Sequence, residues 1–216
     1  MKRKSNRPKK KSHGFKSYKG FKLYIGKATM SKSAVDEDLV ELIKNLWNSN
    51  ESTKKMRKHI KYVSIKNLSS SKRAGSWNLE KQKVEIIQVN YKPDLNWYEG
   101  TFIHEVEGHA FWDFSRKWRR QELIKFNELA NKMPPVNGYC KKNEKSWKKI
   151  NDESWDKKAK EVHPSMTRYA NEQHSAICEV VRKVGEKNIL IEDKDLKKLV
   201  SAWHKRQHPK RSQIHL

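Results

Sequence analysis

The chain has 216 residues, a formal net charge of +24 and 35% hydrophobic residues. This is the length of one ordinary domain, and so low a hydrophobic fraction means that part of the chain lies outside the core. No apolar run approaches the ~20 residues that span a bilayer, and the basic N-terminus is not followed by the apolar segment of a signal peptide. Only two cysteines, Cys140 and Cys178, are present, which excludes a disulfide framework. We therefore expect a cytoplasmic protein with free thiols and no membrane partner.

The N-terminal segment is basic throughout, and residues 1–22 contain no acidic residue. Such a block is typical of a disordered arm that binds nucleic acid. We predict a disordered basic tail over residues 1–20, followed by one domain over residues 21–216. A second basic stretch covers residues 194–211. Together the two stretches predict non-specific, salt-sensitive binding of DNA or RNA, with a lysine-rich proteome as the alternative explanation.

The first half of the domain has the patterns of both strands and helices. Alternating, β-branched segments predict strands at residues 21–25, 60–65 and 83–89. A helix is predicted from an N-cap at Ser33 to Trp47, because its apolar residues recur every three or four positions.

The second half of the chain is predicted to be mainly helical. The longest helix covers residues 101–130 and is ended by the Pro134-Pro135 pair. Residues 141–160 mix charges and predict a segment that is half solvated helix and half linker. A further helix begins near Tyr169, and a terminal helix covers residues 193–205.

The most informative stretch lies within the longest predicted helix and reads His104-Glu105-Val106-Glu107-Gly108-His109. Two histidines about one turn apart, with a glutamate beside the first, are how zinc peptidases hold metal and general base together. The usual spacing is H-E-x-x-H, and here one extra residue separates the histidines. In a regular α-helix, residues five apart differ in direction by about 140°, so the two imidazoles could not share an ion. We therefore predict a π-type turn, which absorbs one residue, and Gly108 lowers the steric cost of that backbone.

The pattern H-E-x-x-G-H resembles the zinc motif of the dipeptidyl peptidase III family, a gluzincin-type metallopeptidase family with this lengthened spacing. It is also similar to the zincin motif H-E-x-G-H-A with one residue added, and it covers the metal helix and one later helix. The resemblance implies a small α+β zincin-like domain, in which a short, mainly antiparallel sheet packs on the metal-binding helix and on further C-terminal helices. It also implies a Zn²⁺ ion held by His104 and His109, with Glu105 as the general base.

A catalytic zinc site needs a third protein ligand, and the helix after Tyr169 offers several. The segment Asn171-Glu172-x-x-Ser175 resembles the N-E-x-x-S pattern that carries the third, glutamate ligand in gluzincins. Glu172 is therefore the first choice. Glu179 and His174 remain alternatives, and Glu179 could instead orient a histidine from outside the ligand shell.

Further residues are assigned supporting roles. In related peptidases a phenol just before the third-ligand helix faces the cleft, which makes Tyr169 the candidate oxyanion donor and His163 a weaker one. Asp113, four residues after His109, could accept the proton of that ring's second nitrogen. Glu107 is expected to face water. Cys140 could add a metal ligand, but it has no C-x-x-C partner.

The leading hypothesis is a zinc-dependent metallopeptidase that hydrolyses peptide bonds in a peptide or protein substrate. Glu105 would act as the general base, and the strand at residues 83–89 precedes the metal helix as in compact zincins, where a strand at the cleft can hold extended substrate. The alternative is a basic nucleic-acid-binding protein whose zinc site is structural or inactive, and a third is a metal-free basic adaptor. Glu105 favours the first, because a structural site needs no base beside its ligand.

Overall fold

The computed structural model of the protein describes residues 15–18, 21–26, 35–49, 56–68, 73–89, 94–115, 119–149, 159–184 and 191–207. Three predictions concern residues outside these segments. They are most of the basic tail, the N-cap at Ser33, and the end of the second basic stretch.

Within the described segments, five strands form one mixed sheet in the order β1-β2-β3-β5-β4. They are β1 (Phe15–Tyr18), β2 (Phe21–Gly26), β3 (Tyr62–Asn67), β4 (Gly75–Asn78) and β5 (Lys83–Gln88). The central strands β2, β3 and β5 run parallel, whereas β1 and β4 pair antiparallel at the two edges. β4 is therefore an edge strand that pairs with β5 on one side.

The predicted α+β class is confirmed, but the expectation of a mainly antiparallel sheet is wrong at its centre. The chain leaves β2, passes through helix α1 (Glu37–Ser49) and returns as β3, and such a crossover makes the two strands parallel. Alternation within a strand reports which face is buried, and it carries no information about the direction of the neighbour. β1 also lies inside residues 1–20, so the sheet begins within the range that was predicted as tail.

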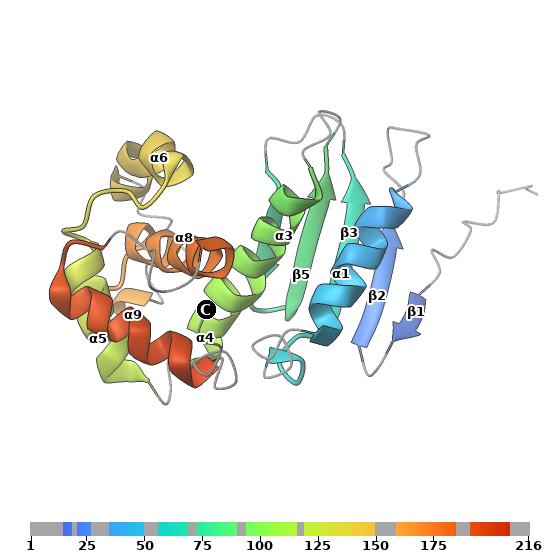
Figure 1. The fold of residues 1–216 in the computed structure, drawn as a ribbon. Helices are drawn as coiled ribbons and strands as arrows, with labels where there is room; N and C mark the ends of the chain where they lie inside the picture. The colour runs from blue at the N-terminus through green and yellow to red at the C-terminus, as the bar shows by residue number, and fades with distance from the viewer. Residues whose placement is uncertain are drawn as a thin grey trace, which may run out of the picture.

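Helices α1 and α3 (Leu95–Ile103) lie on one face of the sheet (Figure 1). Val63 pairs with Val84 and Ile65 pairs with Ile86, and all four side chains are completely buried. They pack with apolar residues of the two helices, among them Leu39, Ile43, Trp47, Phe102 and Ile103. This core fixes the position of α3, which leads directly into the segment that carries the histidines.

The helix predicted over residues 101–130 begins earlier and is divided. The segments are α3, the π-helix η1 (His104–Ala110), α4 (Phe111–Ser115) and α5 (Arg120–Ala130). α3 begins after Asp94, whose carboxylate accepts a hydrogen bond from the backbone N–H of Trp97. Before α5, Arg119 has φ −124° and ψ 26°, which interrupts the helix. The sequence-based prediction missed the N-cap at Asp94. It also interpreted the apolar residues of this stretch as one continuous helix.

A second group of helices packs on the side of α3 and η1 away from the sheet (Figure 1). It consists of α5, α6 (Gly138–Lys149), α8 (Arg168–Val184) and α9 (Lys194–Gln207). Their core contains Trp112, Leu123, Phe126, Ile177 and Leu196. The segment predicted as half helix and half linker includes most of α6, which buries Trp147. None of the helices in the described segments is both long enough and apolar enough to cross a membrane.

Helices η1 and α8 approach each other to backbone distance. A Cβ atom built on Gly108 would lie only 2.6 Å from the backbone Cα of Ser175. Real Cβ atoms do not come this close to backbone, so the glycine allows the two helices to pack at this distance. The packing of α8 against η1 therefore depends on the absence of a side chain at residue 108.

We expect Gly108→Ala to destabilise the protein by about 3 kcal/mol or more, because the new methyl group meets backbone rather than a flexible side chain. Denaturant unfolding of the variant and of the wild type measures this difference. Two further variants, Ser175→Ala and Gly108→Ala/Ser175→Ala, separate the contact with the Ser175 side chain from the contact with its backbone. If the double variant were as stable as Ser175→Ala alone, the backbone contact would not be what limits the packing.

Candidate metal centre

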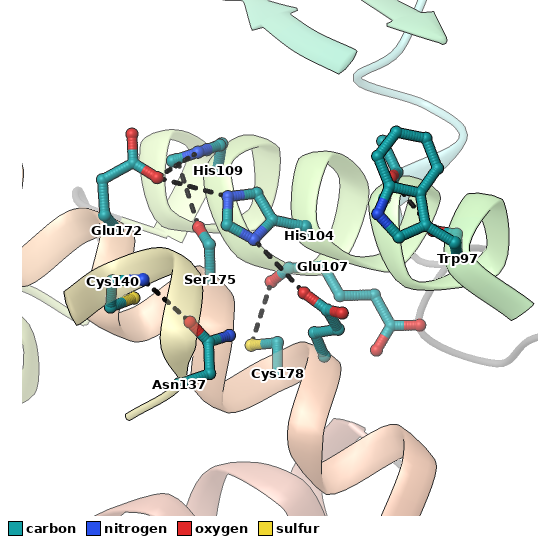
Figure 2. Close-up of polar contacts among 11 residues, drawn as sticks. Trp97, His104, Glu107, His109, Asn137, Cys140, Glu172, Ser175 and Cys178 are labelled. Atoms are coloured by element: carbon teal, nitrogen blue, oxygen red, sulfur yellow. Dashed lines mark hydrogen bonds and ion pairs between the residues drawn. The ribbon is translucent and has the colours of Figure 1, made fainter. Parts of the chain in front are cut away.

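The two histidines of the H-E-x-x-G-H motif lie on η1, and the predicted π-turn is confirmed. Residues His104–Ala110 form a π-helix between two α-helical segments. The wider turn brings the imidazole rings of His104 and His109 together, with their centroids 4.8 Å apart. Both rings face α8 (Figure 2). The extra residue in the motif is therefore absorbed by the backbone, and the side chains converge as they would with the usual spacing.

Glu172 of α8 lies against both rings and completes a group of three donors. Its Oε2 atom is 3.3 Å from Nε2 of His104 and 3.6 Å from Nε2 of His109. All three ligand atoms lie within 4.8 Å of one another, and Glu172 and His104 are buried. Figure 2 shows the carboxylate and the two imidazoles pointing toward a common centre. The first choice for the third ligand therefore reaches the histidine pair.

The second nitrogen of each ring has its own partner on α8. Ser175 Oγ lies 3.1 Å from Nδ1 of His109, and Glu179 Oε2 lies 3.8 Å from Nδ1 of His104. Such partners fix the ring orientation and favour the tautomer whose Nε2 can bind an ion. The expectation that Asp113 orients His109 is not met, because its Oδ2 atom accepts a hydrogen bond from Nε1 of Trp77.

The three donors fit a divalent metal ion. Two ligands 2.0–2.1 Å from a tetrahedral ion lie about 3.3 Å apart, close to both distances from Glu172 Oε2 to the imidazole nitrogens. Neutral imidazole nitrogens and a carboxylate oxygen form the His₂Glu donor set of catalytic sites, which leave one position open. His104, His109 and Glu172 could therefore hold a metal ion.

Glu105 lies next to the first histidine and is itself buried, with 6% of its surface exposed. Its Oε2 atom is buried and has no hydrogen-bond partner among the described residues. Burial raises the pKa of its carboxyl group, and the nearby His109 and His104 only partly oppose this shift. A buried carboxylate oxygen without a partner is costly, which points to a functional role for this side chain.

Without a metal ion, the three donors form an ion-paired cluster. Burial lowers the pKa of His104, but its hydrogen bonds to Glu172 and Glu179 outweigh burial and raise the pKa to about 10. His109 likewise has a raised pKa despite its burial, mainly because of the charge of Glu172. Burial raises the pKa of Glu172, yet the charges of His109 and His104 hold it well below the usual range. At neutral pH the metal-free cluster therefore holds protons that a metal ion must displace.

The cluster opens into a cleft of about 210 Å³. One wall is β4 with Gly75 and Trp77, and the other is the start of α8. Gly75 allows the edge strand to lie close above the general-base candidate, since an added Cβ would come within 3.1 Å of Glu105 Cγ. The edge strand β4 and the donor group therefore line one cavity.

Two of the predicted site residues lie elsewhere. Tyr169 does not line the cleft: its hydroxyl donates to the carbonyl of Met133 and its ring lies in the small core beneath α6. Tyr169 precedes Glu172 by three residues, and α6 covers its side of α8. His174 is completely buried against the rings of Trp112 and Phe126, and burial lowers its pKa well below the ordinary value. His174 therefore does not belong to the donor group.

The remaining candidates also lie outside the donor group. His163 bonds to Ser165 Oγ through its Nδ1 atom, in the loop before α8. Cys140 is buried in the core beneath α6, where burial raises the pKa of its thiol to about 12. Glu107 was expected to face water, but only 3% of its surface is exposed. Its carboxylate points away from the two imidazoles (Figure 2).

Sequence reasoning missed the two arginines that line the cleft among the described residues, Arg73 and Arg168. Arg168 lies four residues before Glu172 on α8, and its Nε atom is 3.7 Å from Glu172 Oε1. That spacing on one helix face was a signal available in the sequence. Arg73 gave no such signal, because only the fold places the residues before β4 beside the metal helix.

Comparison of the chain with models of protein families, with curated proteins and with solved structures finds no match.

We expect the purified protein to bind about one metal ion per chain, and the double variant His104→Ala/His109→Ala to bind none. Elemental analysis after purification without chelators, and after reconstitution, measures the stoichiometry. His163→Ala is the matched control, since this histidine lies outside the donor group, and it should keep the metal. Wild-type protein that takes up no metal in either preparation would contradict the assignment.

The same binding should depend on pH in a defined direction. Because the pKa of metal-free His104 is raised to about 10, metal uptake at pH 7 must release its proton. The apparent affinity should therefore rise from pH 6 to pH 8, by about tenfold per pH unit for each proton released. Titration calorimetry in buffers of different ionisation enthalpy counts the protons directly.

Proposed function

We propose that the protein is a zinc-dependent metallopeptidase. The observation that carries the proposal is the group of His104, His109 and Glu172, beside which a buried oxygen of Glu105 has no hydrogen-bond partner in the part of the chain that the structure describes. Three ligands and an adjacent carboxylate are the components of hydrolytic zinc sites. A structural zinc site has four protein ligands and needs no such carboxylate.

Zinc is proposed over the other ions that this donor set accepts. Two histidines and one carboxylate also hold Fe²⁺ in oxygenases, where they occupy one face of an octahedron. An oxygenase site has no need of a general base next to a ligand, whereas hydrolysis does. Glu105 therefore favours zinc and hydrolysis. Iron as the ion found by elemental analysis would overturn this choice.

Zinc, when bound, supplies a Lewis acid that polarises the scissile carbonyl and makes a water molecule more acidic. In this mechanism, Glu105 accepts the proton of the attacking water and passes it to the leaving amine. Burial raises its pKa, which brings the carboxyl group closer to neutral pH, where such transfers are most efficient. Ser175 and Glu179 keep the imidazoles of His109 and His104 in the orientation that ligation requires.

The edge strand β4 is the proposed support for an extended peptide. It pairs with β5 on one side and lines the cleft with Gly75 and Trp77. A peptide added along such an edge gains backbone hydrogen bonds whatever its side chains are. Because Gly75 approaches Glu105, a strand-like substrate on β4 would run past the general base. Tyr169 is not proposed as the oxyanion donor, because its hydroxyl donates a hydrogen bond to the backbone carbonyl of Met133.

Glu105→Gln should keep the metal and lose about 10²–10⁴-fold in the rate of peptide hydrolysis, because it removes the base and leaves the ligands. Mass spectrometry of a complex peptide mixture incubated with each protein measures cleavage, and elemental analysis measures zinc. Glu107→Gln is the matched control, a buried glutamate of the same π-helix that points away from the donors, and it should keep most of the activity. Equal activity of Glu105→Gln and wild type would contradict the mechanism.

We also propose that the basic tail binds nucleic acid without sequence preference. Residues 1–14 contain seven lysines and arginines and no acid, and they precede β1. Each cation placed near a phosphate releases about one counterion, so binding should weaken steeply as salt concentration rises.

Deletion of residues 1–14 should reduce the slope of log affinity against log salt by about 0.9 for each phosphate that the tail neutralises on duplex DNA. The metal content should stay unchanged, since the donor group lies on η1 and α8. Fluorescence anisotropy with labelled DNA and RNA at several salt concentrations measures the slope. Full-length protein that binds neither nucleic acid at low ionic strength would remove this second function.

A further inference from the structure

Resting on the proposed peptidase function, we infer that the cleft selects substrates with a carboxylate within about two residues of the scissile bond. Two arginines, Arg73 and Arg168, line the same cavity as the donor group. They lie on opposite walls, one just before β4 and the other at the start of α8. The guanidinium group is suited to a carboxylate, because its planar N–H donors match the two oxygens.

Arg73 stands on the substrate-binding wall. It precedes Gly75 by two residues, is exposed, and lines the cleft together with Glu105. A peptide laid along β4 advances about 3.3 Å per residue, so a side chain near Arg73 belongs to a residue close to the scissile bond. An acidic residue there gains a charge-assisted hydrogen bond.

Arg168 stands on the opposite wall. Its Nε atom is 3.7 Å from Glu172 Oε1, and its side chain is 35% exposed. A guanidinium has five N–H donors, so it can bind more than one acceptor at the same time. The contact with Glu172 also limits the side chain's rotation, so less entropy is given up when a substrate carboxylate binds.

The charge balance of the cleft supports an anionic substrate. Among the described residues, its lining carries two arginines against three carboxylates, those of Glu105, Asp113 and Glu172. A divalent ion on the donor group makes the total positive. Asp113 is further occupied by the indole N–H of Trp77 at 2.8 Å. A lysine or arginine at the same substrate position would meet the guanidinium groups and the metal, and like charges repel.

The chain carries a net charge of +24, so a general attraction for acidic peptides must be separated from recognition in the cleft. Charges farther apart than the Debye length of about 8 Å at 0.15 M ionic strength are largely screened. Isomeric peptides of one composition, with glutamates either beside the central bond or at the ends, have equal net charge. A preference between such isomers at 0.15 M salt reports local recognition.

The test begins with wild-type, zinc-loaded protein and a proteome-derived peptide mixture, with cleavage sites identified by mass spectrometry. Aspartate and glutamate should be enriched within two residues of the cleaved bonds. Peptide pairs that differ by glutamate and glutamine at the enriched position are then bound to Glu105→Gln protein, where no turnover is needed. The glutamate peptide should bind about tenfold more tightly or better, as expected for a charge-assisted hydrogen bond.

Arg73→Gln and Arg168→Gln, each combined with Glu105→Gln, should reduce this ratio of dissociation constants toward one. Arg120→Gln is the matched control: it removes the same charge from α5, where Arg120 bonds to the carbonyl of Val162, and it should keep the ratio. Zinc content is measured in every variant, because Arg168 also contacts Glu172. Amidated and free C-termini distinguish a terminal carboxylate from an acidic side chain.

The outcomes separate the two proposals. Cleavage without acidic enrichment, or a glutamate preference that survives both arginine substitutions, would overturn the carboxylate inference and leave the peptidase proposal standing. Zinc-loaded protein that cleaves no peptide and whose Glu105→Gln variant binds none would overturn the peptidase proposal and the inference with it.

Discussion

The spacing of five residues between His104 and His109 is the constraint on which the rest of the site depends. A regular α-helix would direct the two imidazoles about 140° apart, and no ion could touch both. The π-helix η1 removes this difference, at the cost of a backbone that is rare because its hydrogen bonding and packing are poorer. Such a turn persists only where tertiary packing holds it, and here α3 anchors its start in the main core.

The packing of α8 against η1 supplies both that support and the rest of the ligand environment. Gly108 lets α8 approach to backbone distance, and this approach delivers Glu172 to the histidines. The same helix face presents Ser175 and Glu179 to the outer ring nitrogens. One interhelical contact thus sets the third donor and the orientation of the first two. A change at Gly108 should be felt in stability and in metal binding together.

The electrostatics of the cluster follow from burial in this same interface. Removing carboxylates and imidazoles from water is costly, and the opposite charges of Glu172 and the two histidines offset that cost. For Glu105 the charges of His109 and His104 only partly offset burial, and its Oε2 atom has no hydrogen-bond partner among the described residues, so its pKa is raised. The interface therefore holds two different carboxyl groups. Glu172 is ionised and can coordinate an ion, whereas Glu105 has an increased affinity for a proton. On the cleft side, Arg73 and Arg168 add further positive charge beside the donor group.

The sequence by itself determined the α+β class, the motif residues, the need for a π-turn, and Glu172 as the leading third ligand. The strands and the need for a π-turn follow from local rules, since side-chain direction along a helix and alternation along a strand depend only on nearby residues. Glu172 was chosen because its segment resembles the N-E-x-x-S pattern of gluzincins. Tertiary structure decided that the centre of the sheet is parallel and that Tyr169 is buried beneath α6. It also decided that His174 lies among aromatic rings in the core and that Arg73 lines the cleft. Each of these depends on contacts between residues far apart in the chain, whose geometry no local pattern encodes.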